Sequence, residues 1–532
     1  MPDPAARSIF LAVSMPTPEA ERQPAEAAEP AEAAPSLGPH PRSSGARAAL
    51  FVIAFASGFA VLTIEIAGAR LIAPVFGLSA VPWTAVIGVI LAALAVGSHL
   101  GGRLADAGVV PLSTVLGVAG LTGALPVLGG GFPWMARDVL GFIPGAIVSA
   151  LVLFAPPVLC LGAVVPFLVQ ADTESLGTVG RRAGDVSAAA TAGSIAGTFA
   201  TGFVLLPALP LPFLLGLTSA GLFLMAAFSG RVLGRGPGEG RMAAGALILG
   251  ALGYLASQPV AGTLHAQQTL YSAVQVTERA REDGRLVREM FQNGGSSSAE
   301  YVDTGEPAHE YVTVSQRLLE PVIDDARTML VLGGAALSLP VAFQHRRPSM
   351  RITVVEIDPV VTELASRYFT YGEGSYPGIA VVHEDARVFL RDSDERFDLV
   401  YLDVFDHLLT VPWTLVTAEA LHDMAARLSP DGLFVANVLS PLVGPGVGFL
   451  EHFRATLEGA FGEVRIYLTD AALDPLVTQN LIVVASHDGG GTPAADWARE
   501  ASVASAERVL TDSWAPVEFL QAKVFLRGLG WR

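Results

Sequence analysis

Cysteine and lysine are almost missing from this chain of 532 residues. The single cysteine, Cys160, lies in an apolar run, so no disulfide framework and no multi-cysteine zinc or iron–sulfur site can form. The single lysine, Lys523, lies near the C-terminus, which argues against Schiff-base chemistry. We therefore expect no metal site and no permanently bound cofactor.

Charge is also scarce, at 16% of residues against the ~25% of an ordinary soluble protein. Hydrophobic residues make up 51% and the mean hydropathy is +0.49, which excludes a disordered chain and argues against a single soluble globule. Residues 258–532 hold 21 basic and 37 acidic side chains, whereas residues 47–257 hold nine and seven. An acidic half argues against nucleic acid as a partner. It suits a small cationic substrate, although acidity for solubility is the simpler interpretation.

Long charge-free runs dominate the first half of the chain. Residues 1–46, rich in Pro, Ala and Glu, predict a disordered tail. A membrane crossing needs ~20 apolar residues, so residues 47–260 predict a multi-pass transmembrane domain in a lipid bilayer. Prolines at 207, 210 and 212 divide the longest run. We expect seven crossings, near residues 48–67, 81–102, 111–130, 143–168, 187–206, 211–229 and 242–257.

Small residues recur within these runs at the spacing of a helix-packing face. Gly97 is paired in this way with Gly101, and Gly193 with Gly197. Ionisable residues in lipid are costly, and the first crossing ends with two of them, Glu65 and Arg70. Mutual pairing or snorkelling explains these two as well as a functional role does.

From residue 266 the pattern becomes that of a soluble domain. Residues 266–320 predict a small β-rich piece, with turn signals at Asp283–Gly284 and Asn293–Gly294. Residues 321–490 alternate strands with helices, which predicts a doubly wound, mostly parallel α/β sheet of the Rossmann type. Residues 491–532 form a C-terminal extension that we expect to pack on this domain or on the membrane.

Four strand ends carry residues suited to an adenosyl ligand, which such sheets bind at the carboxyl ends of their strands. In chain order these are Gly333 with Gly334, Glu356 with Asp358, Asp385, and Asp403 followed by Asp406. The glycines permit a close approach, and an acid ~20 residues later suits the hydroxyls of a ribose. The phosphate-binding pattern G-x-G-x-x-G is absent, since the sequence there is Gly-Gly-Ala-Ala-Leu-Ser. That disfavours NAD.

The order LVLGG, VVEIDP, HEDAR, DLVYLDVFD and LSPDGLFVAN resembles the spermidine synthase (polyamine aminopropyltransferase) family. That family has the fold of the S-adenosylmethionine-dependent methyltransferases. The apolar half looks like that of its membrane-anchored branch, so the resemblance covers about residues 48–490. It implies a transferase of polyamine biosynthesis that moves an aminopropyl group from decarboxylated S-adenosylmethionine to a polyamine such as putrescine. It also leaves a homodimer open.

The resemblance assigns roles residue by residue. Asp403 corresponds to the catalytic aspartate, and Asp406 to the aspartate that holds the acceptor amine. Tyr271 and Tyr311 correspond to tyrosines of the substrate channel. The co-substrate, decarboxylated S-adenosylmethionine or S-adenosylmethionine itself, would be bound by Gly333, Gly334, Glu356, Asp385 and Ala386.

The chain departs from the family where the tail of the donor is recognised. Ala336 stands at the position of an aspartate that grips the donor's amino group, and Ser272 and Ser298 stand where glutamines are expected. An altered donor or acceptor is therefore open. So are two other functions: a methyltransferase that uses S-adenosylmethionine, and a polyamine transporter or sensor that binds without catalysis.

Two arguments on orientation disagree. With the N-terminus inside, the inner side would hold eight arginines and the outer side only Arg70 and Arg137. Seven crossings would then place the soluble half outside the cell. Adenosyl donors are made and kept inside cells, so we expect a multi-pass protein of the cell membrane whose catalytic domain faces the cytoplasm.

Overall fold

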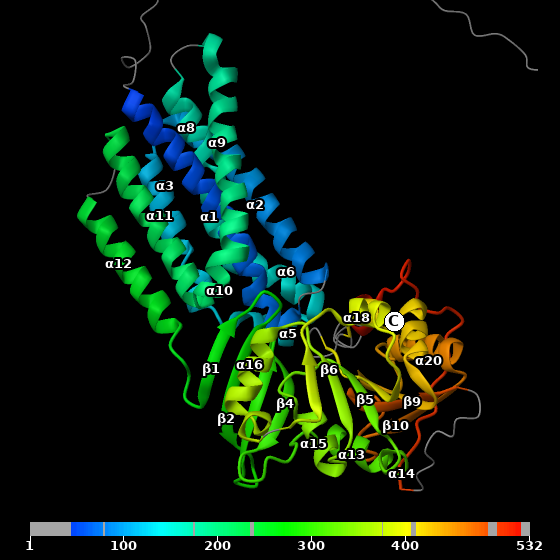
Figure 1. The fold of residues 1–532 in the computed structure, drawn as a ribbon. Helices are drawn as coiled ribbons and strands as arrows, with labels where there is room; N and C mark the ends of the chain where they lie inside the picture. The colour runs from blue at the N-terminus through cyan, green and yellow to red at the C-terminus, as the bar shows by residue number, and fades with distance from the viewer. Residues whose placement is uncertain are drawn as a thin grey trace, which may run out of the picture. The chain divides into compact units, whose positions relative to one another are not determined.

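The computed structural model of the chain describes residues 44–77, 80–173, 176–234, 239–374, 376–405, 411–487 and 497–522. Up to Ala256 these residues are helical, and from Thr263 onward they form two β-sheets with accompanying helices (Figure 1). The predicted tail, residues 1–46, falls almost wholly outside the described residues.

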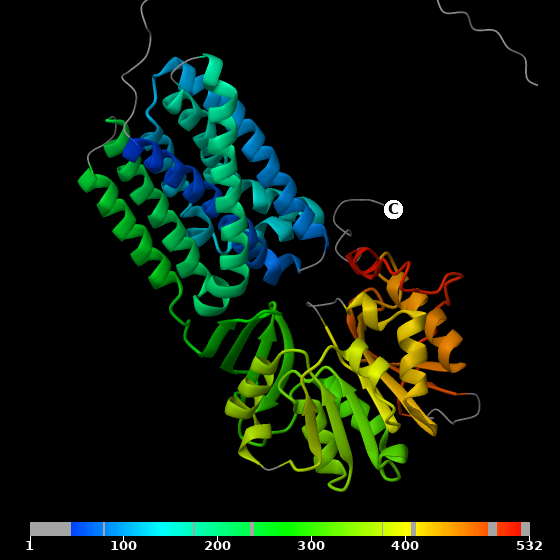
Figure 2. The same cartoon turned by 45° about the horizontal axis from the view of Figure 1, so that its top comes forward.

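The apolar runs form helices that pack along one another as a bundle, as both views of the fold show (Figure 2). These helices are α1 (Ser44–Phe76), α2 (Ala80–Ala107), α3 (Leu112–Thr122), α4 (Leu125–Leu128), α5 (Phe132–Leu140), α6 (Phe142–Leu153), α7 (Ala155–Gly162), α8 (Val164–Asp172), α9 (Val179–Ala200), α10 (Leu206–Ala208), α11 (Leu211–Leu233) and α12 (Glu239–Ala256). The chain breaks between α10 and α11, as the three prolines predict, and a π-helix, Thr201–Leu205, precedes the break.

Five helical segments of the described residues are long and apolar enough to cross a membrane. A sixth results if the pair Leu112–Leu128 and Phe132–Leu140, which is bent by 71°, counts as one span. The sequence predicted seven crossings. The chain bends at the end of the third of them, between Leu128 and Phe132, where three glycines, residues 129–131, separate the two helices. At the seventh, the described residues form an apolar helix, Gly240–Ala256, that is shorter than each of the five segments.

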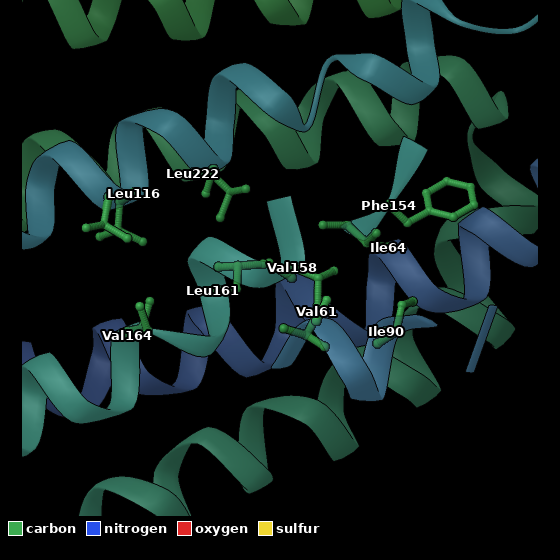
Figure 3. Packing of buried hydrophobic residues seen from close by; sticks show 14 of the residues in the cluster. Val61, Ile64, Ile90, Leu116, Phe154, Val158, Leu161, Val164 and Leu222 are labelled. Atoms are coloured by element: carbon green, nitrogen blue, oxygen red, sulfur yellow. The ribbon is translucent and has the colours of Figure 1, made fainter. Parts of the chain in front are cut away.

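The small-residue faces are packed as predicted. A Cβ atom built on Gly193 of α9 would lie 1.9 Å from the carbonyl oxygen of Phe55 on α1, and one on Gly97 of α2 would lie 2.0 Å from that of Leu159 on α7. Gly101 and Gly197 are in similarly close contact with these neighbouring helices. Branched side chains from α1, α2, α3, α7, α8 and α11 fill the core between the helices, among them Val61, Ile90 and Leu222 (Figure 3).

The β-rich piece is a four-stranded antiparallel sheet in the order β1-β2-β3-β4. Its strands are β1 (Thr263–Gln268), β2 (Ala273–Ala280), β3 (Leu286–Gln292) and β4 (Gly295–Tyr301). The two predicted turns join β2 to β3 and β3 to β4. Both central positions of the second turn, Asn293 and Gly294, have positive φ, as a two-residue hairpin loop requires.

The second sheet has seven strands in the order β10-β11-β9-β8-β5-β6-β7. They are β5 (Thr328–Leu332), β6 (Arg351–Val355), β7 (Ile379–Val382), β8 (Phe397–Leu402), β9 (Leu428–Ser440), β10 (Glu463–Leu468) and β11 (Gln479–Ser486). The first five are parallel, as predicted, but β11 pairs antiparallel with both β9 and β10. The sheet is therefore mixed, because the link 469–478 is too short for a parallel crossover.

Helices cover both faces of this sheet, so its strands are apolar on both sides. Leu330 and Leu332 of β5 pack with α18 (Ala386–Asp392), α19 (Ala418–Ala426) and α20 (Gly448–Phe461). Met329 and Val331 of the same strand pack with α13 (Glu310–Leu318), α15 (Ser338–Arg346) and α16 (Pro359–Tyr368). After β7 the chain returns to the other side of β5 to form β8. That reversal creates the crevice at which ligands bind in sheets of this kind.

Candidate active site

A cavity of about 600 Å³ opens at the carboxyl ends of β5, β6, β7 and β8. Most of the predicted site residues that the structure describes line it together: Tyr271, Tyr311, Gly333, Gly334, Glu356, Asp358, Asp385, Ala386 and Asp403. Asp406 belongs to residues 406–410, outside the described residues, so its role stays a prediction. The residues that the strand ends predicted thus lie together in one cavity, although they are far apart in the chain.

Glu356 binds the glycine loop that follows β5. Its Oε2 accepts hydrogen bonds from the backbone N–H groups of Gly334, at 2.9 Å, and Ala335, at 3.1 Å, and its Oε1 accepts one from Asp358 N–H at 3.0 Å. Burial raises the pKa of Glu356, and these three bonds oppose that effect. Glu356 therefore fixes the loop shape and presents its carboxylate at the edge of the cavity.

Gly333 is required where it stands. Its φ of +89° disfavours other residues, and a Cβ atom there would lie 2.4 Å from the carbonyl oxygen of Asp403. The end of β5 can therefore approach the end of β8 closely, with Asp403 N–H donating to Leu332 O at 2.9 Å. The glycine loop and the candidate catalytic residue are held as one unit.

Asp385 caps α18 at the third strand end. Its Oδ1 accepts hydrogen bonds from the N–H groups of Arg387 and Val388, at 2.8 and 3.2 Å. Both bonds use the same oxygen, which leaves Oδ2 for a ligand in the cavity. Ala386, the first residue of the helix, adds a small side chain to the wall beside it.

Asp403 lies half-buried between two hydrogen-bond donors. Its Oδ2 accepts from the hydroxyl of Tyr311 at 2.7 Å, and its Oδ1 accepts from Nδ2 of Asn437 at 3.0 Å. Burial raises the pKa of Asp403, while these two bonds oppose the rise. Burial and the nearby Asp403 raise the pKa of Tyr311 well above its usual value, so Tyr311 remains a donor. The result is a fixed carboxylate with increased affinity for a proton.

The segment 269–272 brings Tyr271 and Ser272 into the lining of the cavity. The buried Thr269 hydroxyl donates to Oδ2 of Asp358 at 2.6 Å. The oxygen of the Thr269 hydroxyl in turn accepts from the N–H groups of Tyr271 and Ser272, at 3.1 and 2.9 Å. Because Asp358 follows Glu356, this short segment is tied to the side of the cavity that holds the glycine loop.

The departures from the expected glycine loop have a structural counterpart. Ala336 is buried and its N–H donates to the Ser298 hydroxyl on β4 at 3.1 Å. Ala335 and Leu337 both have positive φ, at 43° and 61°, although neither is glycine. The loop thus keeps its tight turn, but it places the methyl group of Ala336 where the family pattern has an acid.

Two polar side chains of the site, Asn437 and His309, are not among the site residues predicted from the sequence. Asn437 of β9 is 4% exposed and lies among apolar residues, in the sequence FVANVL. A polar amide within an apolar strand is the signal that the sequence offered, because a buried amide needs hydrogen-bond partners. His309 lines the cavity beside Tyr311, and its Nε2 lies 2.9 Å from the Ser296 hydroxyl. Burial lowers the pKa of His309, which favours its neutral form.

This arrangement can bind a ligand with two hydroxyls near Glu356 and present a second reactant to Asp403. A carboxylate whose pKa is raised can orient an amine and take its proton. The described lining includes no Lys or Arg side chain, so the cavity suits a cation better than an anion.

Comparison with known proteins shows that the region holding this site is similar to one family. Residues 309–468 match the spermine/spermidine synthase domain. Polyamine aminopropyltransferase 1 of Streptomyces coelicolor is 28% identical over 430 residues, which cover 75% of this chain and 77% of that protein. A match of that extent reaches beyond the soluble half into the apolar half. The polyamine aminopropyltransferase of Vibrio vulnificus is 29% identical over 205 residues, which cover 38% of this chain and 65% of the relative.

Among solved structures, a probable spermidine synthase from Corynebacterium glutamicum matches with a TM-score of 0.37 and 23% identity. The match covers 43% of this chain and 81% of that one.

Proposed function

We propose that the chain, which is similar to the spermidine synthase family of transferases, transfers an aminopropyl group from decarboxylated S-adenosylmethionine to an amine such as putrescine, at a membrane. The observation that carries this proposal is the setting of Asp403. It is a proton-accepting carboxylate held beside a strand edge that suits an adenosyl group.

The reaction that we propose balances without another reactant. A primary amine attacks the propyl carbon bonded to the sulfonium, so a C–N bond forms as the C–S bond breaks. The sulfur keeps the electron pair of the broken bond and leaves as a neutral thioether. Asp403 orients the amine and receives the proton that the new ammonium loses. Tyr311 and Asn437 keep the carboxylate in place throughout.

The donor half of the cavity would hold the adenosyl group. In this proposal the Glu356 carboxylate accepts from the ribose hydroxyls and Oδ2 of Asp385 accepts from the adenine amino group. Gly333 and Gly334 allow the sulfonium to approach Asp403. Tyr271 and Tyr311 would border the acceptor, and Asp406 would hold its far ammonium.

One observation favours a second candidate function. Ala336 removes the acid that would select the amino group of a decarboxylated donor, so S-adenosylmethionine with its carboxylate meets less repulsion. The second candidate is therefore methyl transfer to an amine.

One experiment separates the two functions. The full chain, purified in detergent, is incubated with putrescine and either S-adenosylmethionine or its decarboxylated form, and the products are identified by mass spectrometry. We expect spermidine and methylthioadenosine from the decarboxylated donor. A methylated amine with S-adenosylhomocysteine would support the second candidate. Turnover of neither donor would contradict both.

The apolar helices support a further part of the proposal, an enzyme embedded in the bilayer. The proposed cytoplasmic position of its soluble half follows instead from the chemistry, because adenosyl donors are made and kept inside cells. Extraction tests whether the protein is embedded in the bilayer. A membrane protein stays in the pellet after washing with alkaline carbonate and is released by detergent. Release by carbonate would contradict it.

A further inference from the structure

The acceptor side of the cavity is supported by α1, a helix of the apolar half. Near the end of this helix, Nη2 of Arg70 donates to the Leu270 carbonyl oxygen at 2.9 Å, and Nη1 donates to that of Tyr271 at 3.4 Å. Tyr271 lines the cavity. The sequence alone explains Arg70 by pairing or by snorkelling. In the structure, its side chain binds the backbone of a segment of the site that lies 200 residues away in the chain.

The segment that Arg70 binds is fixed on its other side by the donor half of the site. Thr269 connects it to Asp358, which follows Glu356 at the end of β6. The segment 269–272 therefore spans from α1 to the edge that would bind the ribose. The position of Tyr271 depends on both attachments.

A second contact lies one helical turn further along α1. Pro74 stands four residues after Arg70, so both lie on the same face of the helix. A Cβ atom on Gly294, in the turn between β3 and β4, would lie 2.7 Å from the Pro74 carbonyl oxygen. The residues flanking Gly294, Asn293 and Gly295, line the cavity.

The two supported segments also bind each other. Oδ1 of Asn293 accepts a hydrogen bond from Ala273 N–H, which follows Ser272, at 3.0 Å. Both segments line the cavity. The last turns of α1 contact both segments, one through the side chain of Arg70 and the other through the backbone of Pro74.

We propose that the end of α1 positions the acceptor half of the active site, with Arg70 and Pro74 as positioning residues for the segments 269–273 and 292–296. This inference rests on the proposed function for its kinetic consequence. It gives the apolar half a role in substrate binding beyond anchoring, because a shift of α1 would move the acceptor wall while the donor edge stays with the seven-stranded sheet.

The test compares kinetic constants of the full chain in detergent. Arg70→Gln loses a charged donor, and we expect the Michaelis constant of the acceptor to rise about tenfold while the dissociation constant of the donor changes less than about twofold. Arg70→Lys keeps the charge but not the two-pronged geometry, so it should raise the Michaelis constant less. Loss of donor affinity equal to the loss for the acceptor would mean a general structural role and would overturn the proposal.

Two glycines provide a matched pair of variants that leave Arg70 intact. Gly294 and Gly284 are both in hairpin turns with φ of +81°, so alanine causes similar backbone strain in each. Only Gly294 would meet α1, because nothing lies within 4 Å of a Cβ at Gly284. We expect Gly294→Ala to raise the acceptor's Michaelis constant and Gly284→Ala to leave it unchanged. Equal effects from the two would overturn the proposal.

A measurement without turnover separates this inference from the proposed function. If the wild-type chain transfers no aminopropyl group, the proposed function fails, but hydrogen exchange still tests the positioning role. Backbone amides of 269–273 should exchange faster in Arg70→Gln than in the wild type, with the amides of β5 unchanged. Equal exchange of 269–273 in the two proteins would overturn the inference.

Discussion

At the scale of single residues, Asp403 combines two properties that rarely favour stability: it is charged and it is poorly solvated. Its raised pKa means that the folded protein binds a proton there more readily than the unfolded chain does. Above that pKa the buried carboxylate therefore destabilises the fold. A carboxylate that lowers the stability of the fold is typical of groups that perform chemistry.

We predict that Asp403→Asn lowers turnover by about 10²–10⁴-fold, the usual contribution of a positioned base. The variant should keep or increase its melting temperature at neutral pH, because the amide removes the charge from a poorly solvated site. Kinetics with thermal unfolding of the same sample measures both. A folded variant with full turnover would show that Asp403 is not catalytic, whereas a large loss of stability would indicate a structural residue.

The pH dependence of activity should depend on the two side chains that donate hydrogen bonds to Asp403. Asp403 acts as a base only when it is deprotonated, so activity falls as the pH drops through its raised pKa. Asn437→Leu removes a bond that lowers that pKa, so the acid limb of kcat/KM should move to higher pH. Asn480→Leu, at another amide of the same cavity, should leave the limb in place whatever its effect on rate. Identical limbs in Asn437→Leu and the wild type would contradict this account.

Glu356 can be tested through binding alone. Loss of a charge-assisted hydrogen bond costs about 1.5–3 kcal/mol, so Glu356→Ala should weaken donor binding by roughly tenfold or more in calorimetry. The exposed Asp392→Ala should bind the donor like the wild type. Unchanged affinity in Glu356→Ala would remove Glu356 from the donor site.

At the scale of elements, the bundle depends on helices whose backbones touch. Gly193 of α9 meets the backbone of α1, whereas nothing lies within 4 Å of a Cβ at Gly184, an exposed residue of the same helix. Gly193→Leu should therefore destabilise the bundle, since overpacking typically costs about 1–3 kcal/mol. Gly184→Leu should be neutral or stabilising, because leucine favours a helix more than glycine does. Thermal unfolding in detergent compares them, and equal melting temperatures would contradict the packing role of Gly193.

At the scale of the whole molecule, α1 bears on the orientation in the membrane. Its first residue is Ser44, and Arg70 near its other end contacts the soluble half. If α1 crosses the bilayer, the N-terminus and the soluble half lie on opposite sides, which requires an odd number of crossings. Chemistry favours a cytoplasmic soluble half, whereas the distribution of arginines favours the reverse.

We predict opposite locations for reporters at the two ends of the chain, with the one after Arg532 in the cytoplasm. Paired fusions of a reporter active only in the cytoplasm and one active only outside provide the measurement. A C-terminal reporter active only outside would contradict the cytoplasmic assignment. Both ends on one side would contradict an odd number of crossings.

Much of this protein follows from its sequence because the relevant signals are local. Apolar runs of helical length, alternating strands and the Asn293–Gly294 turn each depend on residues close together in the chain. The acids at the strand ends also follow, since a parallel sheet brings all those ends to one edge. That rule is sufficient to group Gly333, Glu356, Asp385 and Asp403 before any coordinates are known.

Tertiary structure decided what no local pattern contains. Asn437 reaches Asp403, and Arg70 reaches the carbonyl groups beside Tyr271, only because the fold brings distant segments together. The antiparallel pairing of β11 with β9 likewise joins segments that are distant in the chain. A side chain's partner is set by the path of the whole backbone. The sequence therefore determined which residues are candidates for the chemistry, and the fold determined which residues hold them in place.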